Sequence, residues 1–448
     1  MSEKVGLKSH EKVDFHKEIA IIGGGPAGAL AGYLLAKKGF TNVTIYDTGQ
    51  FKIEQKIEKC PGCAGIIQPK VVQFLEKHGL VIPEDIIQNR LSKESLIHLP
   101  GNTNLPIQNE RGGAITVYRR PAPVKQPNDI PRTKSFDGWL LDEATKAGAS
   151  YKRFLVKEID LRRKKNINKK VTLTIDNGEV IEADFVIGAY GHNALKEDGI
   201  NILYPEGTAH LDKPTASISA VREIFIGREG VAKLLQNKMH LFGNPTEKIW
   251  YAMVVPKDNH VTVSIMGRGN NSEKEMNDIM KDFLQSDSIR NLLSDVSKQV
   301  RCGCTSTYTT KSPENYIAQD EDGNLSMVNI GDAGPTRPMK NGIGAAMDSA
   351  EKLVGALSQY GFGRETSEIY KNYIDQEYIL DNYWADFILK MTDQILARQA
   401  LLKPTRFILT HHLWPFKKPI NDIINLIISG EKPYWQIPLA QITEKLFH

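Results

Sequence analysis

The segment EIAIIGGGPAGALAGYLL, residues 18–35, joins a short apolar run to a glycine-rich turn and an apolar helical pattern. The apolar run predicts a buried strand, and the pattern that follows it predicts a helix. Gly23 permits a tight turn, Gly25 lets the backbone approach an anionic ligand, and Gly28 allows close packing of helix on strand. Unpaired N–H groups and the dipole at the helix N-terminus favour a pyrophosphate there. The predicted cofactor contacts in this turn are Gly23, Gly25, Pro26, Ala27 and Gly28.

A carboxylate follows at the spacing expected of a β-α-β unit. Residues 42–46 predict a second strand, and Asp47 at its end lies 19 residues after Gly28. A carboxylate at that position accepts hydrogen bonds from ribose hydroxyls. FAD and NAD share this pattern, so a second motif has to distinguish them.

The second motif is MVNIGDAGP, residues 327–335, and it is followed by NGIGAAM, residues 341–347. In these motifs the chain resembles the flavoproteins typified by aromatic hydroxylases and geranylgeranyl reductases. The resemblance implies that Asp332, after Gly331, reaches the ribitol of FAD. It also implies that a helix beginning with Gly342, Ile343 and Gly344 points its N-terminus at the flavin ring, where backbone amides stabilise negative charge on the reduced cofactor.

Two further segments extend this resemblance, which covers residues 16–360. SFDGWL, residues 135–140, looks like the family's helix that follows an FAD-contacting arginine. The candidates for that arginine are Arg119, Arg120 and Arg132.

ADFVIGAYG, residues 183–191, matches a third motif that usually ends Gly-Ala-Asp-Gly, but Tyr190 replaces the Asp. This departure concerns the handling of nicotinamide more than flavin binding. The sequence has no second GxGxxG downstream, so we expect NAD(P)H, ferredoxin or another carrier to deliver electrons by transient docking.

The geranylgeranyl reductase group is the most similar part of the superfamily. KCPGCAGI, residues 59–66, lies where that group has a cysteine loop beside the flavin. YAMVVP, residues 251–256, lies where the group has a Tyr-x-Trp-x-Phe-Pro strand that lines a lipid pocket. The resemblance implies that Tyr251, Met253 and Pro256 contact substrate, although Met253 and Val255 replace the usual Trp and Phe.

The four cysteines form a CxxC at Cys60 and Cys63 and a CxC at Cys302 and Cys304. If both segments reach the flavin, as the resemblance implies, the thiols are candidates for a redox pair across the two segments, because proximity to the flavin activates thiols. Four thiolates holding zinc or an iron–sulfur cluster are an alternative metal site, but CxC is an unusual second half. The third alternative is buried and chemically idle cysteines.

Composition excludes several classes of protein. The net charge of +4 over 448 residues is small, and the sequence shows no nucleic-acid-binding motif. The polar first 17 residues do not resemble a signal peptide, and no apolar run is long enough to span a bilayer, so we expect a cytoplasmic protein. Aromatic and basic residues gather at positions 407–418, which suits either a lid over the substrate domain or peripheral contact with a membrane.

The predicted fold is α/β, with a Rossmann-type FAD-binding domain interleaved with a mostly antiparallel substrate sheet, plus a helical C-terminal unit. The predicted FAD domain comprises residues 16–75, 130–192 and 300–365; the substrate domain comprises 76–129 and 193–299; and the C-terminal lid or membrane-facing unit is 366–448. We expect an oxidoreductase that reduces C=C bonds of a hydrophobic, isoprenoid-like substrate, or catalyses the reverse reaction. A flavin monooxygenase or halogenase, and an electron-transfer flavoprotein with cysteine-bound metal, are the alternatives.

Overall fold

A computed structural model describes residues 13–49, 63–99, 103–109, 112–121, 134–162, 170–192, 199–293, 300–337 and 342–397. Its nucleotide-binding part is built on a six-stranded sheet in which five neighbouring strands are parallel and one edge strand is antiparallel. In spatial order the strands are β19 (Ile317–Gln319), β20 (Leu325–Asn329), β12 (Phe185–Gly188), β1 (Glu18–Ile22), β2 (Asn42–Tyr46) and β8 (Ser150–Lys152).

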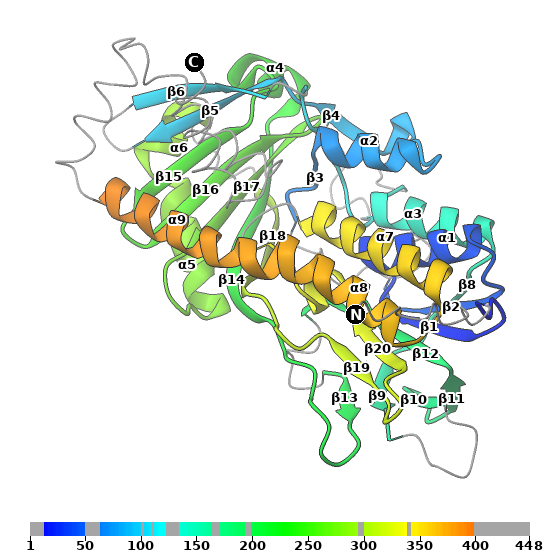
Figure 1. Ribbon diagram of the computed structural model, residues 1–448. Coiled ribbons are helices and arrows are strands. Elements are labelled where there is room, and N and C mark those ends of the chain that lie inside the picture. The colour runs from blue at the N-terminus through cyan, green and yellow to red at the C-terminus, as the bar shows by residue number, and fades with distance from the viewer. Residues whose placement is uncertain are drawn as a thin grey trace, which may run out of the picture.

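Alternating side chains of β1 bury the two faces of this sheet against different layers. Ile19 and Ile21 pack with helices on one face, whereas Ala20 and Ile22 pack with a small sheet on the other. The helices are α1 (Pro26–Lys37), α3 (Phe136–Ala147) and α7 (Gly342–Tyr360), which lie together in Figure 1. The small sheet contains β11 (Val180–Ala183), β10 (Val171–Ile175), β9 (Val156–Asp160) and β13 (Asn201–Leu203).

A seven-stranded sheet forms the second part of the molecule, and all its neighbouring strands are antiparallel except β15 and β5. Helices α4 (Gly227–Leu235), α5 (Glu273–Leu284) and α6 (Asp287–Leu293) cover one face. In spatial order the strands are β18 (Val300–Lys311), β14 (Thr215–Phe225), β17 (His260–Gly267), β16 (Ile249–Pro256), β15 (His240–Thr246), β5 (Glu94–Leu99) and β6 (Thr103–Gln108), as Figure 1 shows.

A small three-stranded sheet and a helix connect the two parts. The sheet has β7 (Ile115–Val117) at its centre, between β3 (Ile66–Ile67) and β4 (Ile87–Arg90). The 3-10 turn η1 (Glu84–Ile86) leads into β4, and helix α2 (Pro69–Lys77) follows β3.

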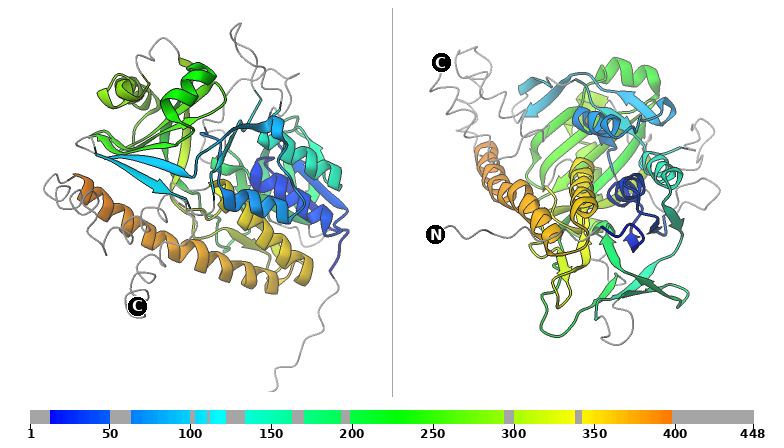
Figure 2. Two further views of the ribbon diagram at one scale, coloured as in Figure 1. Left: turned by 90° about the horizontal axis from the view of Figure 1, so that it is seen from above. Right: turned by 45° about the vertical axis from the view of Figure 1, so that its right-hand side comes forward.

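The C-terminal helices run along the side of the molecule. Helix α8 (Arg364–Ile374) continues through a π-helical turn, η4 (Asp375–Ile379), into α9 (Leu380–Ala397). Figure 2 shows α9 extending from the helices of the nucleotide-binding part toward the far end of the seven-stranded sheet, where it contacts β15. Among the described helices, none combines the length and the apolar character that crossing a bilayer requires.

The predicted fold class is confirmed, but one predicted boundary is wrong. Strand β18 pairs with β14 over most of its length, so the FAD-binding segment predicted to begin at residue 300 begins with a strand of the seven-stranded sheet. The sequence of β18, VRCGCTSTYTTK, has no bulky aliphatic residue after Val300, so the apolar alternation typical of a strand is absent there. The last part of the predicted C-terminal unit, residues 398–448, lies outside the described residues.

Candidate functional site

The turn after β1 is so tight that two of its glycines touch backbone atoms. Gly23 has φ +113°, and a Cβ added to it would lie 2.3 Å from the carbonyl oxygen of Ala189. A Cβ added to Gly28 would lie 1.9 Å from the carbonyl oxygen of Gly23. These two glycines therefore serve the packing of helix, strand and turn, in agreement with the roles predicted for them.

Gly25 differs from its neighbours because space is open beside it. It is the N-cap residue of α1 and has an extended backbone, with Pro26 following at the first helical position. A Cβ added to Gly25 would meet only the Arg119 guanidinium, at 4.0 Å. Within the described part of the chain, no side chain caps this helix end. Backbone N–H groups and open space at a helix N-terminus fit the pyrophosphate of FAD.

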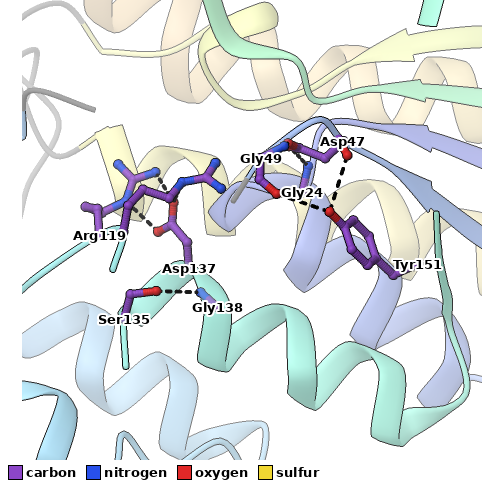
Figure 3. Close-up of polar contacts among 9 residues, drawn as sticks. Gly24, Asp47, Gly49, Arg119, Ser135, Asp137, Gly138 and Tyr151 are labelled. Carbon is purple, nitrogen blue, oxygen red and sulfur yellow. Dashed lines mark hydrogen bonds and ion pairs between the residues drawn. The ribbon is translucent and has the colours of Figure 1, made fainter. Parts of the chain in front are cut away.

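Asp47 lies at the end of β2, beside the glycine turn (Figure 3). Its Oδ2 accepts a hydrogen bond from the N–H of Gly24 at 2.5 Å, and its Oδ1 accepts one from the N–H of Gly49. Each carboxylate oxygen retains a second lone pair, so these bonds leave acceptor capacity for a ribose hydroxyl. Tyr151 supports the same turn, since its hydroxyl donates to the carbonyl oxygens of Asp47 and Gly49 at 3.3 Å. Contact between Asp47 and the ribose stays a prediction.

A buried ion pair places one arginine at this helix end. Asp137 is completely buried in the first turn of α3, and Arg119 donates to both of its oxygens, at 2.5 and 2.8 Å (Figure 3). Arg120 also approaches Asp137, with Nε 3.4 Å from Oδ2. Two parallel bonds fix the guanidinium plane of Arg119 next to Gly25. Arg132, the third predicted arginine, lies outside the described residues.

Sequence reasoning named the segment around Asp137 but missed this side chain. Ser135 caps α3 by accepting the N–H of Gly138 at 3.2 Å, which is a recognisable helix start. An acidic residue in the first turn of a helix is common for electrostatic reasons alone, so the sequence does not reveal its partner. Burial acts to lower the pKa of Arg119, but Asp137, with a further contribution from Cys63, outweighs it and raises that pKa above its ordinary value.

The two cofactor motifs meet in space although they are far apart in the chain. Gly331 has φ +61°, and a Cβ added to it would lie 2.9 Å from the Cβ of Ala27 in α1. Ser349 of α7 accepts the N–H of Gly331 at 3.1 Å. The Asp332 carboxylate lies 3.6 Å from where a Cβ of Gly342 would be, so it is beside the first turn of α7. Ile343 and Gly344 occupy that same turn.

Histidine 192, which follows the third motif, is another residue that sequence reasoning missed. Its ring nitrogens contact the hydroxyls of Thr307 and Thr309 on β18, at 2.9 and 2.8 Å. Burial lowers the pKa of His192, and the nearby Asp332 opposes that shift. Strand β18 of the seven-stranded sheet is thereby joined to the end of the third motif. Within the third motif, Tyr190 donates its hydroxyl proton to Oδ1 of Asn329 at 3.0 Å.

The cysteines are only partly covered by the structure. Cys63 carries a free thiol that interacts with Arg119, and its sulfur accepts the N–H of Gly65 at 3.3 Å. Cys304 lies on β18, where its thiol approaches the carbonyl oxygen of Val221 at 3.9 Å. Cys63 and Cys304 therefore form no disulfide in this structure.

Cys60 lies outside the described residues, as does the side chain of Cys302, whose backbone pairs with Glu223. Among the described side chains, which do not include those of Cys60 and Cys302, no cluster of three metal-binding groups occurs. The redox pair and the four-cysteine metal site both stay predictions.

One face of the predicted substrate strand, called the apolar surface below, packs into a largely buried cluster whose partly buried members include Tyr251 and Met253 and, from the connecting sheet, Ile66. Along β16, Ala252 and Val254 pack beneath the outer helices, whereas Tyr251, Met253 and Val255 face the other way. The side chains that gather on this second face are Ala64, Ile66, Leu91, Ile97, Leu99, Leu105, Ile107, Ala114, Met239, Leu241, Tyr251, Met253 and Val255. Ala64 and Ile66 immediately follow Cys63, so the cysteine loop leads directly onto this apolar surface.

Two predicted substrate residues have different surroundings. Burial raises the pKa of Tyr251, so its hydroxyl remains protonated across the physiological range. Pro256 is buried at the end of β16, and its carbonyl oxygen accepts a hydrogen bond from Thr116 at 3.4 Å. Of the three predicted contacts, Tyr251 and Met253 therefore lie on the apolar surface, whereas Pro256 packs against β7.

Curated relatives with detectable sequence similarity are geranylgeranyl diphosphate reductases. The chloroplastic enzyme of Nicotiana tabacum is 27% identical over 261 residues, which are 55% of this chain and 47% of the relative. The enzyme of Synechocystis sp. (strain PCC 6803) is 24% identical over 261 residues, or 55% and 54% of the two chains. The chain thus spans about half the length of the curated relatives it matches.

Solved structures with the same fold are more distant in sequence. The flavin-dependent brominase Bmp2 superposes with a TM-score of 0.61 at 14% identity, covering 97% of this chain and all of that one. A flavoprotein/dehydrogenase from Cytophaga hutchinsonii has a TM-score of 0.60 at 17% identity, covering 93% of each chain. The model of the FAD binding domain family matches residues 16–376, and the chain belongs to this family of FAD-dependent oxidoreductases.

Proposed function

We propose that this flavoprotein reduces C=C bonds of a hydrophobic, isoprenoid-like substrate. The observation that carries the proposal is the largely buried apolar face of β16 and β15, where Tyr251 and Met253 stay partly buried beside Ala64 and Ile66, the segment after Cys63. Sequence similarity to geranylgeranyl diphosphate reductases supports the same substrate class. An apolar surface with few polar groups suits an isoprenoid chain, because burial of its methylene groups supplies most of the binding free energy.

FAD, when bound, would supply the redox chemistry, namely a hydride from N5 of its reduced form to one carbon of the double bond. Backbone amides at the start of α1, with Arg119 beside them, would hold the pyrophosphate. Asp47 and Asp332 would accept hydrogen bonds from the ribose and the ribitol. The first turn of α7 would stabilise negative charge on the flavin ring. A proton from solvent or a nearby acid would complete the saturated product.

Tyr251 and Met253 would position the substrate chain in this proposal. The Tyr251 hydroxyl stays protonated because burial raises its pKa, so it can donate one hydrogen bond on an otherwise apolar surface. Met253 offers a flexible side chain that adapts to an irregular apolar ligand. Electrons would reach the flavin by transient docking of NAD(P)H, ferredoxin or another carrier.

An anaerobic experiment tests the reaction. The flavin is reduced with dithionite, the excess reductant is removed, and geranylgeranyl diphosphate is added while flavin absorbance is followed. We expect the flavin to be reoxidised and the product to gain two hydrogens by mass. Met253→Arg should slow this reaction strongly while FAD remains bound, whereas Glu247→Arg, at an exposed turn position, should not.

A different result would favour the alternative chemistry. No reoxidation by the isoprenoid, combined with rapid reaction of the reduced flavin with oxygen and hydroxylation or halogenation of an added aromatic compound, would replace the proposal by a monooxygenase or halogenase. Iron, zinc and sulfide analysis of the purified protein tests the metal-containing electron carrier separately. Parallel reduction trials with NADH, NADPH and ferredoxin would identify the electron donor.

A further inference from the structure

The two residues that follow the Gly-Asp motif are held by the C-terminal helices. Thr336 and Arg337 follow that motif, and α7 begins a few residues later at Gly342. The side-chain amide of Asn382, in α9, donates to the carbonyl oxygen of Thr336 and to Oγ of Ser312, both at 2.9 Å. Ser312 in turn bonds to the backbone of Thr336 at 2.5 and 3.1 Å. Thr336 is therefore fixed by side chains from outside the nucleotide-binding sheet.

Arg337 forms the charged part of this attachment. Its Nε lies 3.4 Å from Oδ2 of Asp381, which is completely buried, and a terminal nitrogen lies 3.8 Å from Glu377. Its guanidinium also lies 5.3 Å from the ring centre of Tyr378, within the range of cation–π attraction. Only 9% of the Arg337 side chain is exposed, so the charge depends on these partners rather than on water.

The network returns to α7 through Tyr378. Its hydroxyl donates to Oδ2 of Asp348, two turns into the helix whose first turn lies beside Asp332. Arg337, Tyr378 and Asp348 line one cleft together with Gly344 of the first turn of α7 and Lys70 of α2. Both ends of the connection to α7 are thus attached to the same C-terminal segment.

The π-helical turn explains how one short segment makes these contacts. Residues Asp375–Ile379 are wound as a π-helix between α8 and α9. Such a turn shifts the helical register, and π-bulges are frequent at functional sites. Here Glu377 and Tyr378 lie within the π-helical turn and Asp381 lies just after it, and all three reach Arg337. An uninterrupted α-helix would direct these three side chains differently.

We propose that Arg337 is a positioning residue through which the C-terminal helices set the affinity and electronic environment of FAD. This role concerns binding of the family's cofactor and not the proposed C=C reduction, so the two proposals can fail independently. Asp381 and Tyr378 hold Arg337, and Asn382 holds the neighbouring Thr336. Tyr378 also bonds to Asp348 of α7, so the end of the Gly-Asp motif and α7 are attached to the same segment. Removing the Asp381 charge loosens this attachment without touching the cofactor.

Titration of purified apoprotein with FAD, followed by flavin fluorescence, tests the proposal. We expect Asp381→Asn to weaken FAD binding by about tenfold or more, a typical size for coupling between distant groups. The flavin absorption spectrum and midpoint potential of the loaded variant should also change. Arg337→Lys, which keeps the charge, should retain most of the affinity. Asp386→Asn is the control, because Asp386 forms an exposed pair with Lys390 on the same helix.

Thermal unfolding of the apoproteins separates positioning from general stability. An Asp381→Asn protein that is less stable, yet binds FAD with wild-type affinity, spectrum and potential, would overturn the proposal. If that variant does not fold, Tyr378→Phe removes only the hydroxyl that bonds to Asp348. The proposal requires a several-fold loss of FAD affinity in this milder variant, and unchanged binding would equally overturn it.

Discussion

Glycines 25 and 28 lie three residues apart but should respond to substitution in opposite ways. Gly25→Ala adds a methyl group that meets no protein atom closer than 4.0 Å, and the backbone of Gly25 is extended, with φ −70° and ψ −174°. Ala suits an N-cap less well than Gly, so we expect the apoprotein to lose only about 0.5–1 kcal/mol of unfolding free energy. Gly28→Ala places its methyl carbon 1.9 Å from a backbone oxygen, which forces helix and turn apart. We expect that change to cost at least about 3 kcal/mol.

For FAD affinity we expect a different pattern, in which the Gly25 substitution that costs little stability weakens binding strongly. The methyl group of Gly25→Ala, and more strongly the branched side chain of Gly25→Val, would occupy space where the pyrophosphate meets the start of α1. Loss of two hydrogen bonds to a charged group corresponds to about 3 kcal/mol or more, which is roughly a hundredfold rise in the dissociation constant. Urea unfolding of the apoprotein gives the first quantity, and titration with FAD gives the second.

Gly363 supplies a matched control. It is the N-cap residue of α8, also with an extended backbone, and an added Cβ would meet nothing within 4 Å. Gly363→Ala should show the same small loss of stability as Gly25→Ala and no change in FAD affinity. If Gly25→Val is purified with wild-type flavin content and dissociation constant, the pyrophosphate does not lie at this helix end and the reasoning is refuted.

Three further substitutions test other parts of the site. Asp137→Asn leaves the buried guanidinium of Arg119 uncompensated and should lower the free energy of unfolding in urea by about 3–5 kcal/mol. The control Glu143→Gln, in an exposed pair on the same helix, should lower it by less than about 0.5 kcal/mol. Equal losses in the two variants would contradict the role given to the Arg119–Asp137 pair. Cys63→Ser should shift the flavin midpoint potential, whereas Cys304→Ser should not. If neither variant shifts the potential, the alternative of chemically idle cysteines is favoured. Burial, with a smaller effect of the neighbouring His98, lowers the pKa of His240 to about 4. The free energy of unfolding should therefore fall by up to about 3 kcal/mol as pH drops from about 6.5 toward 4, because the unfolded state binds the proton more readily. In His240→Gln, the free energy of unfolding should depend less on pH over this range.

Much of the nucleotide-binding part could be predicted because its glycines obey local rules. The positive φ of Gly23 and the contact of Gly28 with a backbone oxygen follow from a tight strand-to-helix turn in any protein. The surface made by Tyr251 and Met253 follows equally simply from the twofold period of a strand. These features depend on a few consecutive residues, which is why sequence alone indicates them.

Partners that are distant in the chain could not be predicted in this way. The acid at position 137 is an ordinary first-turn residue until Arg119 is brought to it, and the intervening chain gives no distance constraint. His192 contacts threonines on β18, a strand whose membership of the seven-stranded sheet was itself mispredicted. Because β18 was assigned to the wrong part of the molecule, its contact with His192 could not be predicted.

The departure at Tyr190 shows how a motif can change and still keep its place in the fold. The Tyr190 hydroxyl donates to Asn329, which immediately precedes Ile330 and Gly331 at the start of the Gly-Asp motif. A Cβ at Gly188 would lie 2.0 Å from that same Asn329 oxygen, so the pair fits only because position 188 lacks a side chain. Burial raises the pKa of Tyr190, which keeps the donated proton in place where an ionised Asp would have none to give. Tyr190 thus links the third motif to the second by a donated hydrogen bond, and Asn329 is the residue that accepts it.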